Sequence, residues 1–146
     1  MRTPTDSIEA AEDRLNLWIY FEENVFRLPE NEECIWSREG CYTWRQVYDQ
    51  SNRYSQFLLS HGVKKGELVG FYLTNSPEFV FAWLGTWGIG TAPAMINYHL
   101  AGEALIHCVK LAGIKVLLVL WSSFSIYIQT QTSVLLKTEC FSDLME

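Results

Sequence analysis

The stretch from residue 67 to residue 120 constrains the fold more strongly than any other part of the sequence. It holds three apolar runs, at residues 67–73, 91–96 and 115–120, and a helical pattern separates each run from the next. Continuously apolar strands that alternate with helices are typical of a parallel sheet covered on both faces. We therefore predict an α/β fold that contains a partial, Rossmann-like βαβαβ parallel sheet. Pro93 lies in the second run, and because proline has no N–H, that strand is predicted to be irregular or to lie at an edge.

The clearest local signal precedes this region. Thr43 and Gln46 have the spacing of a capping box, in which each side chain bonds the backbone N–H of the other residue. Gly62 can adopt the left-handed conformation that ends a helix. A helix is therefore predicted from about residue 44 to residue 60.

The remaining elements follow from spacing and from helix caps. Apolar residues three and four apart indicate a helix that Pro29 ends. Asn75 or Ser76 would cap a later helix that has Pro77 in its first turn. These further helices are expected over residues 15–26, over residues 79–88, and from residues 100–103 to Gly113, with short strands at 34–36 and 41–43.

Charge and cysteine content exclude several classes of function. The net charge is −6, and residues 1–50 carry all of it, with eleven acidic residues against five Arg. Such a chain repels a phosphate backbone, so we expect no nucleic-acid partner. The four Cys lack metal-binding spacing and the first residues are polar, which favours free thiols in a reducing compartment and no signal peptide.

An uncharged stretch of eighteen residues, 79–96, raises the question of a membrane span. Gly85, Gly88, Gly90 and Pro93 interrupt it, so we predict a buried helix followed by a buried strand instead. Peripheral membrane contact by an apolar surface stays open.

The motifs that could carry chemistry are weak. The glycines from 85 to 90 have the wrong order for a dinucleotide-binding loop, and no phosphate-binding loop with a Lys occurs in the sequence. Glu103, His107 and Cys108 are close in sequence, but His61 and His99 do not complete a recognised zinc set. An ion pair between Glu103 and His107 is the simpler expectation.

Three polar residues lie at the carboxyl ends of predicted strands, where open α/β sheets bind ligands. They are Tyr72, Asn75 and Asn97. Capping of the strand ends is the other explanation for these residues, and we favour it. We therefore assign no catalytic, cofactor-binding or metal-binding residue.

Four blocks, in order, resemble a known family. They begin with TWRQ at 43–46, followed by SNR at 51–53, and continue with GVKKGELV at 62–69, NSPEF with WLG at 75–85, and INYHLAGEALIHC at 96–108. The set resembles AMP-forming acyl-CoA synthetases, and the last block is similar to the fatty acid transport protein, or very long-chain acyl-CoA synthetase, branch. His99 replaces a usual Asn. The resemblance implies the amino-terminal part of the adenylate-forming ligase fold.

The resemblance also implies an activity. Full-length members join a fatty acid to ATP as an acyl-adenylate and transfer the acyl group to coenzyme A, with Mg²⁺ neutralising phosphate charge. Their phosphate loop and mobile carboxyl-terminal domain come later than the matched blocks. We therefore expect an amino-terminal fragment that binds no cofactor and is inactive alone. The family implies an intracellular, membrane-associated location, at the endoplasmic reticulum, peroxisome or plasma membrane.

These expectations divide the chain into three parts. Residues 1–33 form an amino-terminal helical segment, residues 34–120 a partial AMP-binding ligase domain, and residues 121–146 a tail whose pattern breaks with what precedes it, as in a truncated gene product. Two alternatives remain. The chain could be an interaction module that associates with itself or with a full-length ligase through an unfinished sheet. It could also be a small nucleotide-binding domain, against which the missing phosphate loop argues.

Overall fold

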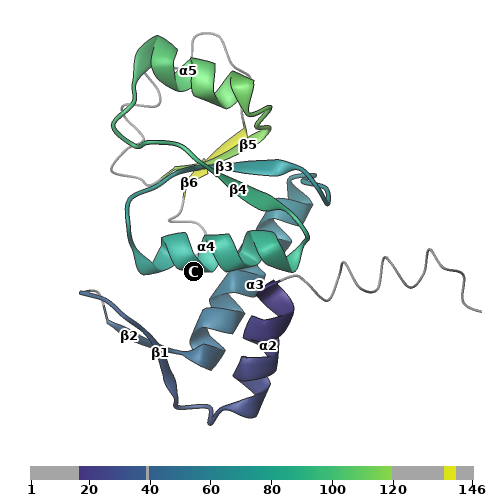
Figure 1. The fold of residues 1–146 in the computed structure, drawn as a ribbon, viewed down its shortest axis with the longest axis vertical. Coiled ribbons are helices and arrows are strands. Elements are labelled where there is room, and N and C mark those ends of the chain that lie inside the picture. Colours follow the sequence, from purple (N-terminus) through teal and green to yellow (C-terminus); the bar gives the residue numbers. More distant parts are fainter. Residues whose placement is uncertain (1–16, 39, 120–136, 141–146) are drawn as a thin grey trace, which may run out of the picture. The chain divides into compact units, whose positions relative to one another are not determined.

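A computed structural model describes residues 17–38, 40–119 and 137–140 (Figure 1). The chain divides into two compact units, residues 1–49 and 50–146, and helix α3 contributes residues to both. The elements are α2 (Leu17–Arg27), β1 (Glu33–Trp36), β2 (Cys41–Thr43), α3 (Trp44–Ser60), β3 (Leu68–Tyr72), α4 (Pro77–Gly88), β4 (Ala92–Met95), α5 (Gly102–Leu111), β5 (Val116–Val119) and β6 (Lys137–Cys140).

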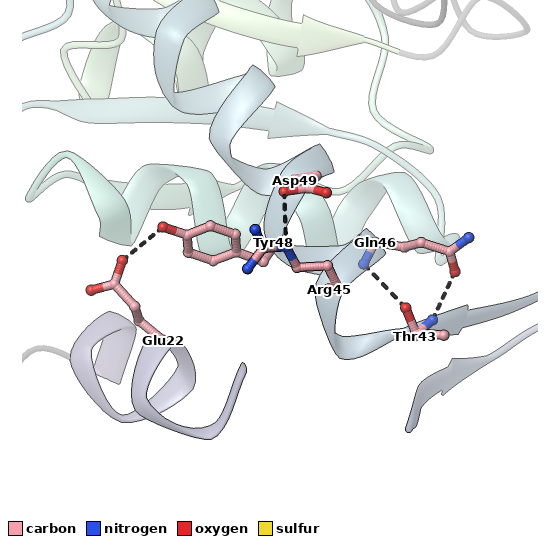
Figure 2. A network of polar contacts seen from close by, with 6 residues as sticks. All are labelled: Glu22, Thr43, Arg45, Gln46, Tyr48 and Asp49. Atoms are coloured by element: carbon pink, nitrogen blue, oxygen red, sulfur yellow. Dashed lines mark hydrogen bonds and ion pairs between the residues drawn. The ribbon is translucent and has the colours of Figure 1, made fainter. Parts of the chain in front are cut away.

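Aromatic side chains hold the first unit together. Trp18 on α2 stacks on Tyr48 of α3 with 5.6 Å between ring centroids, and Phe21 lies 5.7 Å from Trp44. The Tyr48 hydroxyl donates a 2.9 Å hydrogen bond to the Glu22 carboxylate (Figure 2). Stacked and tilted ring contacts of this kind stabilise the unit beyond the effect of the area that the rings bury. The predicted amino-terminal helix is confirmed over its described part and ends before Pro29, as expected.

The two short strands predicted at residues 34–36 and 41–43 pair as an antiparallel hairpin, with Trp36 opposite Cys41. The capping box that follows them is also confirmed (Figure 2). The Thr43 N–H donates to Gln46 Oε1 at 2.9 Å, and the Gln46 N–H donates to Thr43 Oγ1 at 3.3 Å. These two bonds satisfy backbone donors that the helix itself leaves unpaired, so they fix where α3 begins.

Glycines in the left-handed conformation follow the ends of α3, α4 and α5. After α3, the N–H of Gly62 donates to the Leu59 carbonyl at 3.0 Å and that of Val63 to the Leu58 carbonyl at 3.1 Å. Gly62 has φ +79°, a left-handed value that a glycine adopts without a steric penalty. Gly90 and Gly113 make the same pattern after α4 and α5. The predicted glycine stops are therefore confirmed.

The second unit contains a parallel sheet with strand order β4-β3-β5-β6. Val69 on β3 lies opposite Pro93 on β4, and Tyr72 on β3 lies opposite Val119 on β5. The predicted βαβαβ order is confirmed, and so is the edge position of the strand that contains Pro93. Strand β6 pairs in parallel with β5, and its sequence carried no strand prediction.

Helices cover both faces of this sheet (Figure 1). Tyr72 and Leu117 belong to the core on the α5 side, together with Leu105 and Val109 of α5 itself. On the other face, Phe71 packs edge to face with Phe79 of α4 at 5.6 Å. Successive residues of a strand point to opposite faces, and from Val69 to Tyr72 the residues on both faces of β3 are buried. This explains why its sequence is apolar throughout.

The uncharged stretch at residues 79–96 forms most of α4 and then β4, which confirms the order of a helix followed by a strand. The prediction that this strand is buried was wrong, because the residues of β4 are exposed or half-buried, as suits a strand at the end of the described sheet. Within the described residues, every helix is too short or too polar to cross a bilayer.

Candidate functional site

The carboxyl ends of the parallel strands are where the sequence placed its three candidate ligand-binding residues. Tyr72 ends β3 with its ring fully buried, and its hydroxyl donates a 2.6 Å hydrogen bond to the backbone carbonyl of Leu100. Burial raises the pKa of the Tyr72 phenol above its ordinary value. Tyr72 therefore ties the loop between β4 and α5 to the end of β3, which is a structural role.

Asn97 shapes the same loop from within. Its side-chain oxygen accepts from the His99 N–H at 3.0 Å, and its backbone carbonyl accepts from the Leu100 N–H at 3.0 Å. An asparagine side chain that bonds the backbone two residues on is a common device for stabilising a turn. The alternative that we favoured from the sequence, capping at the strand ends, therefore fits both Tyr72 and Asn97.

The third candidate, Asn75, is exposed in the turn before α4. The cap of that helix is Ser76, whose hydroxyl accepts from the Phe79 N–H at 3.4 Å. The sequence left the cap open between the two residues, and the structure decides for Ser76. Its extended backbone, with φ −151° and ψ 167°, is the geometry of an N-cap.

The residues considered for a metal do not come together. Glu103 and His107 are exposed on α5, whereas Cys108 packs against the core on that side of the sheet. Among the residues that the structure describes, no group of three His, Cys, Asp or Glu side chains could hold a metal ion. The ion pair predicted between Glu103 and His107 is not among those formed by described residues, so that expectation was wrong. Both side chains reach solvent, where such a pair gains little.

An ion pair of the second unit lies before β3 and β5. Glu67 pairs there with Lys115, and its carboxylate also accepts from the Lys64 N–H at 3.0 Å. The hydrogen bond from Lys115 is the main reason why the pKa of Glu67 is lowered, and the Lys64 N–H adds to it. These contacts join the turn before β3 to the start of β5, which is a structural role.

The buried polar side chains of the described residues serve the fold. No buried side-chain nitrogen or oxygen in the described part of the chain lacks a hydrogen-bond partner. A buried polar group without a hydrogen-bond partner would have indicated a ligand-binding site. What these residues build is the frame of an open α/β sheet.

Comparison with known families identifies the family to which this sheet and its helices belong. Residues 21–143 match the family described as "AMP-binding enzyme". The chain belongs to the AMP-binding enzyme family. The match includes residues 121–143, which the sequence pattern had set apart as a tail.

Named relatives within the family include fatty acid transport proteins and CoA ligases. The chain is 44% identical over 99 residues to "Isopenicillin N epimerase component 1" of Hapsidospora chrysogena, which covers 67% of this chain and 16% of the relative. It is 35% identical over 82 residues to "Long-chain fatty acid transport protein 2" of Rattus norvegicus, covering 56% and 13%. It is 42% identical over 76 residues to the "Medium/long-chain-fatty-acid--CoA ligase FadD6" of Mycobacterium tuberculosis, covering 52% and 13%.

Solved structures agree on the fold. A benzoate CoA ligase from Burkholderia xenovorans LB400 superposes with a TM-score of 0.80 at 16% identity, over 90% of this chain and 28% of that one. The N-terminal domain of FACL13 from Mycobacterium tuberculosis gives 0.80 at 19% identity, over 89% and 35%. The resemblance to acyl-CoA synthetases, and to their fatty acid transport branch, is therefore confirmed. The chain spans 13% to 16% of the length of the three named relatives.

Proposed function

We propose that this chain is the amino-terminal part of a long-chain or very long-chain fatty acid–CoA ligase. Its role there is to supply the sheet β4-β3-β5 and the helices that cover it, on which later segments carry the chemistry. The ordered sequence blocks, the fatty acid transport proteins among the relatives and the superposition on CoA ligases support this proposal. The segment 34–120 is the proposed partial ligase domain.

The reaction of such a ligase sets what the whole site must do. A carboxylate oxygen of the fatty acid attacks the α-phosphorus of ATP, and pyrophosphate leaves. The thiol sulfur of coenzyme A then attacks the acyl carbon, loses its proton, and releases AMP. Mg²⁺ neutralises charge on the phosphates during such transfers.

The residues of this chain do not fit ATP, Mg²⁺ or coenzyme A by themselves. The sequence has no Ser/Thr/Gly-rich loop with a Lys to hold phosphates, and the described carboxylates form no metal-binding group. We therefore derive no catalytic step from these residues. The second half of the proposal is that the 146 residues alone form no acyl-adenylate. The missing phosphate loop is the observation that supports it.

Exchange of labelled pyrophosphate into ATP, with palmitate as the acid, tests that second half. We expect the purified 146-residue chain to give no exchange above a buffer blank. The rat long-chain fatty acid transport protein 2, measured in parallel, serves as the positive control. Exchange by the chain that depends on palmitate would show that the proposed inactivity is wrong.

A chimera tests the first half. The segment of the rat transport protein that matches this chain is replaced by the corresponding residues of the chain. We expect palmitate-dependent exchange to be retained, whereas the same protein with the segment deleted is inactive. A chimera that is monomeric and folded by circular dichroism, yet forms no adenylate, would count against a shared structural role.

The location of the full-length protein is a proposal of the same kind. The fatty acid transport proteins among its relatives support association with a membrane, at the endoplasmic reticulum, peroxisome or plasma membrane. Fractionation of cells that express the chimera checks this: we expect it in the membrane pellet with the rat protein. A wholly soluble chimera would count against it.

A further inference from the structure

The backbone N–H and C=O groups of β4 face β3 at some residues and point away from the sheet at others. The Ala92 N–H donates to the Glu67 carbonyl and the Ile96 N–H donates to the Phe71 carbonyl, so both face β3. Backbone groups alternate in direction along a strand, which places the groups of Ala94 with these two. Residues 93 and 95 therefore turn their backbone groups away from the sheet.

The outward side of β4 is an open edge in the described structure. The strand lies at the end of the order β4-β3-β5-β6, and Ala92 and Met95 are exposed, Met95 to 51% of the residue's full accessible area. A sheet edge of this kind is a template on which another strand can pair. Two outward positions, 93 and 95, decide whether pairing is possible here.

At one of these two positions the donor is missing. Pro93 has no N–H, so its outward side offers only a carbonyl, and Met95 carries the single outward donor of the strand. We propose that Pro93 blocks strand addition at the β4 edge and so prevents pairing with a second copy of this chain. The block does not depend on the proposed ligase function, because it rests on backbone geometry alone. It also argues against an interaction module that pairs through β4.

A second copy is the partner that the block concerns most directly. Two β4 edges that meet across a twofold axis would run antiparallel and present the same outward residues to each other. With Pro93 in both copies, two donors are lost from one short pair of strands. With an amide N–H restored in both, the pair would gain two hydrogen bonds.

Sedimentation velocity of the full 146-residue chain over a range of concentrations tests the proposal. We expect the Pro93→Val variant to dimerise at a concentration lower by roughly tenfold or more than the unmodified chain, which is the scale of two added backbone bonds. A Pro93→Val/Met95→Pro double variant, which has again one outward donor, should return to the unmodified behaviour.

Matched controls separate the missing donor from other effects of substitution. Ala94→Val adds the same side chain to the same strand, but its N–H faces β3, so it should not change association. Pro29→Val removes a proline outside the sheet and should also change nothing. If Pro93→Val loses its far-UV circular dichroism, the smaller Pro93→Ala replaces it as the test.

The proposal is overturned by any of three results. A folded Pro93→Val or Pro93→Ala variant that associates no more tightly than the unmodified chain is the first. The second is an Ala94→Val variant that associates as tightly as Pro93→Val, because the higher strand propensity of valine would then explain the association of both. Failure of Met95→Pro to reverse the effect is the third.

Discussion

The Ser55 hydroxyl donates a 2.9 Å hydrogen bond to the backbone carbonyl of Gly85, where α3 and α4 touch. The same hydroxyl lies 3.2 Å from the Ser51 carbonyl of its own helix. The contact depends on the missing side chain of Gly85, because a Cβ there would lie 2.7 Å from the Ser51 carbonyl oxygen and 2.8 Å from Tyr54 Cβ. Backbone and a Cβ atom cannot rotate aside, so the two helices meet at a fixed distance.

Substitution of Gly85 by Ala should therefore destabilise the second unit. Ala in a helix interior normally gains about 1 kcal/mol over Gly, but overpacking costs about 1–3 kcal/mol, and the immovable neighbours place this site at the upper end. We expect a net loss that is visible as a lower urea midpoint at an unchanged slope.

Gly88→Ala is the matched control for this experiment. Gly88 lies at the exposed end of the same helix. The substitution should leave the midpoint unchanged or raise it slightly. Equal midpoints for the Gly85→Ala and Gly88→Ala variants would show that the close approach of the helices is not tight.

Tyr72→Phe removes one hydrogen bond and keeps the buried ring. The Leu100 carbonyl loses its 2.6 Å donor, so we expect a loss of about 0.5–1.5 kcal/mol in urea unfolding near neutral pH. The raised pKa of Tyr72 means that its contribution is complete below its unfolded pKa, whose ordinary value is 10.0, and is lost as the pH rises through the folded value. The difference in unfolding free energy between the unmodified chain and Tyr72→Phe should therefore decrease at high pH. A constant difference across that range would contradict this assignment.

Local sequence rules were enough for most element boundaries. The capping box at Thr43 and Gln46 and the stops at Gly62 and Gly113 involve residues a few positions apart, so short-range bonds decide them. The parallel sheet was also predictable, because strands buried on both faces must be apolar throughout.

Long-range partners were not predictable in the same way. The pairing of β6 with β5 joins residues about twenty apart without a hairpin or helix signal in the sequence between them. The bonds from Tyr72 to Leu100 and from Ser55 to Gly85 depend on how folded elements face each other. No catalytic residue could be assigned from the sequence, and two of the polar candidates that it offered, Tyr72 and Asn97, make hydrogen bonds that stabilise the fold.

The Glu67–Lys115 pair should make stability depend on acid pH. Lys115 lowers the pKa of Glu67 in the folded chain below its ordinary value of 4.5. The pair therefore stabilises the fold fully above that value and loses its effect as the pH falls through the folded pKa. We expect the difference in unfolding midpoint between the unmodified chain and Glu67→Gln to be largest above about pH 5.5 and to shrink below pH 4.5.

Salt provides the check on this pair. The Lys115 side chain is 69% exposed, so ions can screen the attraction. Raising the salt concentration at neutral pH should therefore reduce the same difference between the two proteins. A difference that stays constant with both pH and salt would mean that the charge of Glu67 does not stabilise the fold.

The capping box gives a prediction for the first unit (Figure 2). Thr43→Ala removes the acceptor for the Gln46 N–H, and an exposed cap of this kind is worth about 1 kcal/mol. Gln46→Ala removes the reciprocal bond to the Thr43 N–H. Because the two bonds belong to one motif, we expect the double variant to lose less than the two single losses added together. Urea unfolding followed by tryptophan fluorescence measures the losses, and Glu23→Ala, at an exposed position of α2 outside both bonds, serves as the comparison. Strict additivity would mean that the two bonds form independently.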